Sequence, residues 1–228
     1  MAVIPDKFGQ YVLDPAEAKR LASPRQVDHA YLSEDVIDFG YLPDTKALQA
    51  GDLVLVSSVR FELVGWAIRR VQRKLGFAAR HFRWHHAGVY IGRGAMCEAT
   101  RKGVISVSLF NKYVGRHLLR FRRGKDVSTQ KGLEVTVQAM MQLTYRYDSE
   151  AIVNLLIQAF RSSETIAGAP RSVSDRVTIC SQLFADAYST VTLQTIQNDF
   201  SKPVTPAALS LHADFLEDVP VEWVTIVK

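Results

Sequence analysis

Residues 86–100 read HAGVYIGRGAMCEAT, two short apolar runs separated by a glycine-bearing turn. The runs at 86–92 and 95–100 predict two antiparallel strands joined by the Gly92-Arg93-Gly94 turn. Such hairpins build antiparallel sheets, which commonly pack one face on a hydrophobic core. Further strands are expected at 53–58, at 103–109 and around 118–121, with the last two continuing the meander.

The later part of the chain is predicted to be mainly helical. Apolar residues recur at helical spacing there, and Thr178 is expected to cap a helix that carries Cys180. Because strands come first and helices follow, the fold class is α+β. The remaining expected elements are helices at 129–143 and 149–161, short helices opened by Asp14-Pro15 and Thr205-Pro206, and a closing strand at 221–227.

The composition predicts one domain with an extension. The 228 residues are 47% hydrophobic and 22% charged, which suits a globular chain with a substantial core and excludes disordered, collagen-like and coiled-coil classes. No linker rich in Pro, Gly or Ser and no internal repeat divides the chain. Residues 1–50 are therefore interpreted as an N-terminal extension packed on the core, and residues 51–228 as the main domain.

Two segments hold most of the positive charge. Residues 60–83 carry seven Lys or Arg residues against Glu62 alone, and residues 116–125 carry five with no acid, although the net charge is only +5. Such segregation predicts an anionic surface or substrate nearby. Neither segment accompanies a recognised nucleic-acid-binding motif, so nucleic acid is not the expected partner.

The first basic segment predicts an amphipathic helix over residues 59–75. Apolar residues recur three and four positions apart, and cations occupy most of the rest. Two interpretations stay open: a core-packed surface helix with a solvated basic face, or a helix that rests on an anionic membrane. The expected core face consists of Phe61, Val64, Ile68, Val71 and Leu75.

The cysteine content and the N-terminal sequence bear on location. Cys97 and Cys180 are too few for a disulfide framework or a cysteine-rich zinc site, so a reducing compartment is expected. The first residues lack the basic and apolar regions of a signal peptide, and no run of about 18 apolar residues predicts a membrane span. The expected location is the cytoplasm, with peripheral membrane association or export independent of a signal peptide as alternatives.

Cys180 is the candidate nucleophile. It falls in the first turn of its predicted helix, where unpaired backbone N–H groups and the helix dipole favour a thiolate. The same N–H groups can hold the oxyanion that forms when sulfur attacks a carbonyl. A nucleophilic cysteine also needs a base and a group that orients the base.

His86 and Glu98 are the candidates for base and orienting acid. If the hairpin loop has an odd length and is centred on Arg93, Gly88 faces Glu98, and His86 becomes a diagonal neighbour on the same side of the sheet. Gly88 then has no side chain to block the contact. With a two-residue loop, Glu98 would point to the opposite face.

Other interpretations of these residues remain. Cys180 is also acceptable as a small buried core residue, and Cys97, with the opposite strand parity from Glu98, is expected in the core. Only one of the adjacent His85 and His86 can face the site. A metal site built from His81, His86 and Glu98 is a further alternative, although the spacing is not typical of one.

The motif order resembles a known enzyme family. The motifs are Gly51-Asp52-Leu53-Val54-Leu55, the 86–92 run, Glu98-Ala99, Gly103-Val104, Tyr147-Asp148 and Cys180-Ser181-Gln182-Leu183. Together, over about residues 51–190, they resemble the circularly permuted NlpC-like, papain-fold cysteine hydrolases of the YiiX group, in which histidine and acid precede the cysteine. The resemblance implies a permuted papain-like fold, with an antiparallel sheet or half-barrel packed on the cysteine helix, and residues 51–228 as its catalytic domain.

By this resemblance, Cys180 is the nucleophile, His86 the catalytic histidine and Glu98 the third member of the triad. The implied activity is that of an amidase, peptidase or lipid acyl hydrolase or acyltransferase that forms a thioester and needs no cofactor. Relatives include peptidoglycan amidases and lecithin:retinol acyltransferase-like enzymes, and a lipid or acyl-linked substrate is slightly favoured over a peptide. The competing hypothesis is a non-catalytic protein that docks on anionic lipid or polymer through its two basic segments.

Overall fold

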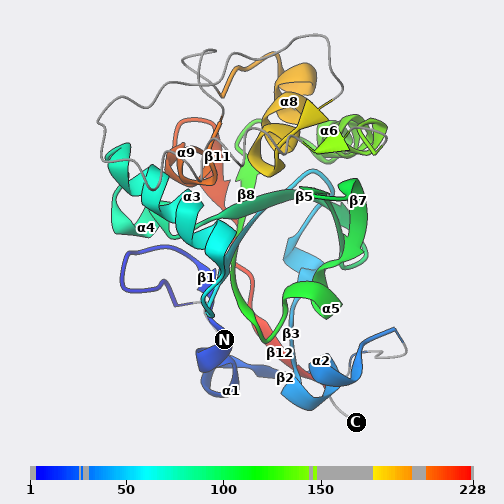
Figure 1. Ribbon diagram of the computed structural model, residues 1–228. Coiled ribbons are helices and arrows are strands. Elements are labelled where there is room, and N and C mark those ends of the chain that lie inside the picture. The colour runs from blue at the N-terminus through cyan, green and yellow to red at the C-terminus, as the bar shows by residue number, and fades with distance from the viewer. Residues whose placement is uncertain are drawn as a thin grey trace.

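The structure is a computed structural model that describes residues 4–25, 27, 31–143, 146–147, 177–196 and 204–226 (Figure 1). Helices and strands both contribute, and every pairing in the larger sheet is antiparallel, which confirms the α+β class. The helix predicted at 149–161 lies outside the described residues.

A curved, seven-stranded antiparallel sheet forms the centre of the molecule (Figure 1). Its strands follow the order β1-β8-β4-β5-β6-β7, and β11 also pairs with β8. β4 takes an inner position because all six residues of its LVLVSS sequence are buried. The strands are β1 (Val12–Leu13), β4 (Leu53–Ser58), β5 (His86–Gly92), β6 (Ala95–Thr100), β7 (Gly103–Ser108), β8 (His117–Gly124) and β11 (Leu216–Asp218).

The expectation that the fourth predicted strand continues the meander is wrong. β8 pairs with β4, on the opposite side of the sheet from β7. The short helix α5 (Leu109–Tyr113), capped by the Ser108 hydroxyl, turns the chain away from β7. β8 then places Leu119 and Phe121, both fully buried, opposite the apolar residues of β4, which leaves neither edge of that buried strand unpaired.

The two ends of the described chain meet in a second, three-stranded sheet. β12 (Trp223–Ile226) pairs with β2 (Ser23–Arg25) on one side and with β3 (Tyr41–Pro43) on the other. The predicted closing strand is therefore present, and the N-terminal residues contribute strands to both sheets. A parallel pair of two-residue strands, β9 (Arg146–Tyr147) and β10 (Val177–Thr178), precedes the helix that carries Cys180.

The helices surround the large sheet, and several predicted starts are confirmed. Asp14 caps the first helical segment, and Thr205 caps α9 with Pro206 at its first position. The helix carrying Cys180 begins at Cys180 itself after Ile179, so the expected Thr178 cap is wrong. The helices are η1 (Pro15–Glu17), α1 (Ala18–Leu21), α2 (Glu34–Phe39), η2 (Thr45–Ala47), α3 (Leu63–Lys74), α4 (Ala79–Phe82), α5, α6 (Thr129–Met141), α8 (Cys180–Thr192) and α9 (Pro206–Leu211).

The predicted core face of α3 is only partly correct. Phe61 lies before the helix and is 76% exposed, and Leu75 is also exposed. The helix instead buries small or polar residues: a Cβ added to Gly65 would lie 3.1 Å from the His85 ring. Gln72 is buried with its amide fully bonded, since it donates to the carbonyls of residues 82 and 84 and accepts from the N–H of residue 207. Close approach to the sheet therefore decides which face of α3 is buried.

Most cations of the second basic segment are engaged within the protein, which contradicts its predicted role as an anion-binding surface. Arg120 and Arg122 are buried in β8, where Arg120 Nε lies 2.7 Å from Asp218 Oδ1 and Arg122 donates to the carbonyls of residues 209, 210 and 216. Arg123 pairs with the buried Asp52, with a shortest N···O distance of 2.7 Å. Arg116 pairs with Asp35. Arg120 and Arg122 attach β11 and α9 to the sheet and share the carboxylate of Asp218, so these buried cations do not face an external anion.

Candidate active site

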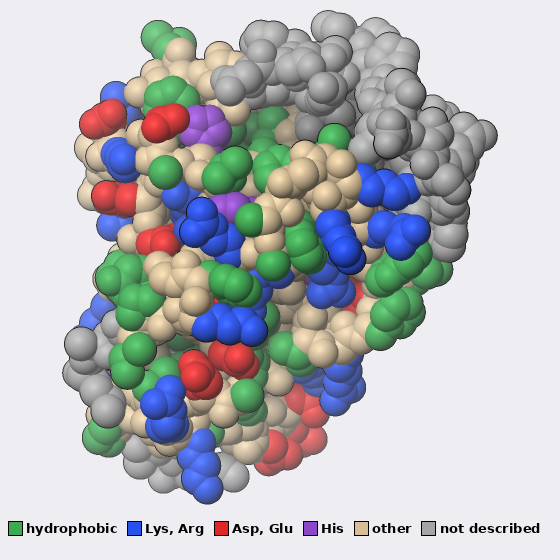
Figure 2. All heavy atoms as spheres, turned by 90° about the vertical axis from the view of Figure 1, so that its left-hand side faces the viewer, with side chains coloured by type: hydrophobic (Ala, Val, Ile, Leu, Met, Phe, Trp, Pro, Cys, Tyr) green, Lys and Arg blue, Asp and Glu red, His purple; other side chains and the backbone are tan. Residues whose placement is uncertain are grey.

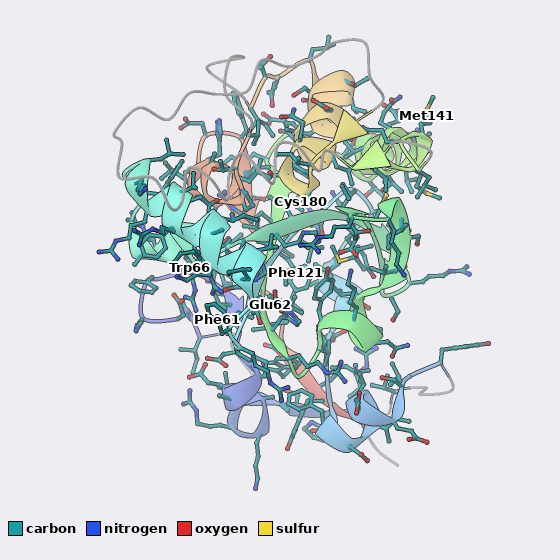
Figure 3. The ribbon with its side chains drawn as sticks, viewed as in Figure 1. Phe61, Glu62, Trp66, Phe121, Met141 and Cys180 are labelled. Atoms are coloured by element: carbon teal, nitrogen blue, oxygen red, sulfur yellow. The ribbon has the colours of Figure 1, made fainter. Side chains whose placement is uncertain are left out.

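The three candidate residues come together at one end of the large sheet. Cys180 is the first residue of α8, which packs against β5 and β6. His86 is the first residue of β5, and Glu98 lies within β6. His86 Nε2 lies 2.8 Å from Glu98 Oε2. Cys180 is buried, and Figure 3 shows it at the end of α8 that faces the sheet.

The hairpin has the two-residue loop Arg93-Gly94, with Gly92 paired to Ala95, so the odd-length loop centred on Arg93 is wrong, but a bulge produces the register that this loop was expected to give. β5 and β6 pair Val89 with Cys97 and Tyr90 with Met96, which is the register that brings Glu98 opposite Gly88. The bulge lies between Tyr90 and Gly92 and shifts the pairing by one residue, so Glu98 lies on the His86 side of the sheet although the loop has two residues. A Cβ on Gly88 would clash with Met96 and lie 2.8 Å from the carbonyl oxygen of Cys97. Gly88 is thus required for the close approach of the two strands that carry His86 and Glu98.

Glu98 has two further partners that the sequence did not predict. Its side chain is fully buried, and it accepts from Lys112 Nζ through Oε1 and from the Tyr113 hydroxyl through Oε2. Both partners lie on α5, the helix that carries the chain away from β7. No spacing in the sequence links them to Glu98, because their position depends on the β7–α5–β8 crossover. A buried carboxylate is tolerable here because three donors share it.

The environment of Glu98 keeps it ionised. Burial raises the pKa of this carboxyl, but the hydrogen bond and charge of His86, and the donors Lys112 and Tyr113, lower the pKa of Glu98 to about 2. In return, burial and the Glu98 charge raise the pKa of Tyr113, so its phenol stays a donor. An ionised acid therefore faces the imidazole at neutral and mildly acidic pH.

Cys180 and His86 are electrostatically suited to a thiolate–imidazolium pair. Burial alone disfavours the charged form of each. Against this, the positive His86, its hydrogen bond, and the backbone N–H groups of Ala87 and Ser181 lower the pKa of Cys180. The Cys180 thiolate and the Glu98 carboxylate raise the pKa of His86 to about 10 against burial. Because Nε2 contacts Glu98, Nδ1 is the ring nitrogen left to contact the sulfur.

The neighbouring histidines take other roles. His85 is buried under α3 and accepts from the backbone N–H of Ser58 at 2.8 Å, and burial followed by nearby positive charge lowers the pKa of His85 to about 3. His81 bonds Ser210 Oγ through Nδ1 at 3.0 Å and receives a hydrogen bond from Arg80. The alternative metal site of His81, His86 and Glu98 is therefore wrong, and no group of three potential metal ligands occurs among the described residues.

Cys97, the other cysteine, occupies the core as predicted. It is fully buried among apolar side chains, and its Sγ lies 3.7 Å from the carbonyl oxygen of Ala139. Burial and the charge of neighbouring Glu98 raise the pKa of the Cys97 thiol to about 11. Its thiol stays protonated at neutral pH.

A second polar cluster borders the site on the side of α3. Glu62 Oε1 lies 3.6 Å from His117 Nε2, and Glu62 Oε2 lies 4.0 Å from His85 Nε2. The His117 ring packs edge-on against Tyr113, with ring centroids 5.0 Å apart, and Tyr113 in turn bonds Glu98. The residues just before α3 are thus connected to the triad through two aromatic side chains.

Comparisons with known proteins do not add to this description. No family model, no curated protein and no solved structure matches the chain. Among the described residues, no helix combines the length and apolar character needed to cross a bilayer.

Proposed function

We propose that this protein is a cysteine hydrolase or acyltransferase acting on an amide or ester bond, with Cys180 as nucleophile, His86 as base and Glu98 as the group that orients the base. One observation carries the proposal: Cys180 begins α8 beside the ring of His86, whose Nε2 lies 2.8 Å from Glu98 Oε2. Nucleophile, base and orienting acid in hydrogen-bonded series are the constellation that covalent acyl transfer requires.

The geometry supports a two-step reaction. The Cys180 thiolate attacks the carbonyl carbon, and the oxygen that becomes negative can be stabilised by backbone N–H groups at the start of α8. The bond to the leaving amine or alcohol then breaks as imidazolium His86 donates its proton to that group, leaving a thioester on Cys180. Neutral His86 next takes a proton from water, or from another acceptor, which attacks the thioester and regenerates the thiolate.

Glu98 supports both proton transfers without taking the proton. Its carboxylate fixes the orientation of the imidazole and compensates the charge of the imidazolium. Lys112 and Tyr113 are positioning residues, because they contact Glu98 and hold its two oxygens in place.

The fold resemblance is a further part of the proposal. The order His86, Glu98, Cys180 is that of the permuted NlpC-like, papain-fold hydrolases, and an antiparallel sheet packed against the cysteine helix is consistent with that architecture. We infer a permuted papain-like fold, with a lipid-linked or peptide amide or ester as the substrate class.

Mass spectrometry of a trapped acyl-enzyme tests the proposal. The intact protein is incubated with a series of p-nitrophenyl acyl esters, quenched in acid and digested. The expected result is one acyl group on the peptide containing Cys180, released by hydroxylamine as thioesters are, and none on the Cys97 peptide. The Cys180→Ala variant should form no adduct. An adduct elsewhere, or turnover that persists in this variant, would overturn the assignment.

A further inference from the structure

An exposed apolar cluster lies where α3 begins, next to the candidate active site. Phe61 and Leu63 are 76% and 55% exposed, and Val59 is also exposed. Trp66, one turn into α3, is only partly buried. Figure 3 shows Phe61, Glu62 and Trp66 on the α3 side of the molecule, away from Met141 on α6. Large apolar side chains that are exposed together favour a binding surface, and those at the start of α3 continue into exposed arginines, which the exposed apolar residues of α6 do not.

Exposed cations extend along the same side of α3. Leu63, Trp66, Arg70 and Arg73 recur three and four positions apart, so they share one face of α3, opposite the buried Gly65 and Gln72. The Arg70 guanidinium lies 5.6 Å from the centroid of the Trp66 ring, and Arg70 and Arg73 are exposed. Figure 2, which views the side of the molecule that carries α3, shows basic and hydrophobic side chains interspersed over it.

The single acid of this segment is directed toward the histidines beside it. Glu62 lies between Phe61 and Leu63 in the chain, but its carboxylate contacts His117 and His85 at 3.6 and 4.0 Å. The Glu62 side chain is still 47% exposed, so the exposed part of the segment is apolar with one histidine-paired acid at its start and cationic further along. Through His117, which packs against Tyr113, the same contacts connect this segment to the triad. The exposed surface at the start of α3 therefore lies close to the candidate active site.

We propose that this surface docks on an anionic lipid bilayer and turns the Cys180 site toward it. The α3 docking surface, as we name it, consists of Arg60, Phe61, Leu63, Trp66, Arg70 and Arg73. Its apolar residues enter the boundary between headgroups and acyl chains, while its cations contact lipid phosphates. A soluble polyanion would bind only the cations of this surface. A bilayer also accommodates the apolar side chains of Phe61 and Leu63. Docking does not depend on the proposed chemistry.

Vesicle binding by the full-length Cys180→Ala variant tests the proposal separately from catalysis. The variant should sediment with vesicles of phosphatidylcholine and phosphatidylglycerol, less with phosphatidylcholine alone, and less at high salt. Trp66 gives a local signal, because Trp84 and Trp223, the other two tryptophans, are buried. Anionic vesicles should shift the emission to shorter wavelength, and the Trp66→Phe variant should lack this shift.

Paired substitutions locate the surface. Phe61→Ser with Leu63→Ser should weaken vesicle binding by about tenfold or more, and Phe61→Leu should retain it. Arg70→Glu with Arg73→Glu should weaken binding by about 30-fold or more at low salt. The control pair Val137→Ser and Met141→Ser, two exposed apolar residues of α6, should bind normally.

Three results would overturn the proposal. They are normal vesicle binding by the Phe61 and Leu63 pair, loss of binding by the α6 control pair alone, and binding to RNA or heparin without binding to anionic vesicles. Each variant is accepted only if its thermal unfolding midpoint matches that of the parent, so that a loss reflects the surface and not misfolding.

Discussion

The two cysteines occupy contrasting environments within one fold. Both are buried, yet the pKa of Cys97 is raised to about 11 and that of Cys180 is lowered. Cys97 Sγ faces a carbonyl oxygen and lies near the negative Glu98, and both of these neighbours disfavour a thiolate. Cys180 faces the backbone N–H groups of Ala87 and Ser181 and the positive His86. The atoms around the sulfur, more than its burial, decide whether a cysteine is inert or nucleophilic.

Exchanging each cysteine for alanine gives the largest expected contrast. Cys180→Ala should lower kcat/KM for an activated acyl ester by at least about 10⁴-fold, because the nucleophile is removed. Cys97→Ala should change kcat/KM by no more than a few-fold and lower the free energy of unfolding by about 1 kcal/mol through a small core cavity. Steady-state kinetics and denaturant unfolding measure the two effects. Comparable activity losses in the two variants would remove the distinction.

Removing the imidazole of His86 should raise the pKa of the Cys180 thiol, so that Cys180, like Cys97, stays protonated at neutral pH. His86→Ala should lower kcat/KM by about 10³- to 10⁴-fold. With the charge of His86 gone, burial dominates, and the pKa of Cys180 should rise above the ordinary value of about 8.5. The ultraviolet absorbance of the thiolate, followed against pH with Cys97→Ala as background, reports the change. An unshifted titration would mean that His86 does not set the state of the sulfur.

Replacing Glu98 should lower the pKa of His86 without removing the base. Glu98→Gln leaves the imidazole in place but removes the negative charge that helps to raise the pKa of His86 to about 10. We expect kcat/KM to fall by about 10²-fold and the basic limb of its pH profile to move to lower pH. Since the pKa of Glu98 itself is about 2, the parent enzyme should show no acidic limb from this group. If the basic limb of the pH profile of Glu98→Gln stays in place, the contact of Glu98 with His86 does not set the pKa of the base.

The α5 partners of Glu98 should give the smallest effects. Lys112→Met removes a cation from Glu98, so kcat/KM should fall by less than about tenfold while the basic limb stays or moves to higher pH. Tyr113→Phe removes a neutral donor from the same carboxylate, so it is the matched comparison for the loss of a charged donor. Lys112→Arg keeps the positive charge and should restore the pH profile of the parent enzyme. A Lys112→Met basic limb that moves to lower pH, as in Glu98→Gln, would contradict this positioning role.

The sequence predicted the local elements well and the long-range ones less well. The 86–100 hairpin, the strand at 53–58 and the Thr205 cap depend on neighbouring residues, and each is present. The position of β8 beside β4 depends on which strands are buried, which periodicity alone does not reveal. The same crossover brings Lys112 and Tyr113 to Glu98, so these residues could not be found from spacing.

Charge patterns were the least reliable guide. The two basic segments look alike in the sequence, but the structure uses Arg120 and Arg122 to bind carbonyls and Asp218 inside the fold, while α3 presents Arg70 and Arg73 outward. A run of cations does not show which side chains find buried acceptors. Strand parity fixes which residues share a face, but the contact of His86 with Glu98 also depends on the bulge between Tyr90 and Gly92, because the two-residue loop alone would turn Glu98 to the opposite face.

Alkylation of the two cysteines in the folded protein, followed by mass spectrometry across pH, reports directly whether Cys180 is a thiolate. We expect Cys180 to react with iodoacetamide at a nearly constant rate to well below about pH 8, where an ordinary thiol becomes unreactive. Cys97 should react only after unfolding. A Cys180 rate that falls tenfold per pH unit below about pH 8 like that of an ordinary thiol, or a Cys180 that stays unlabelled, would contradict the thiolate on which the proposed function depends.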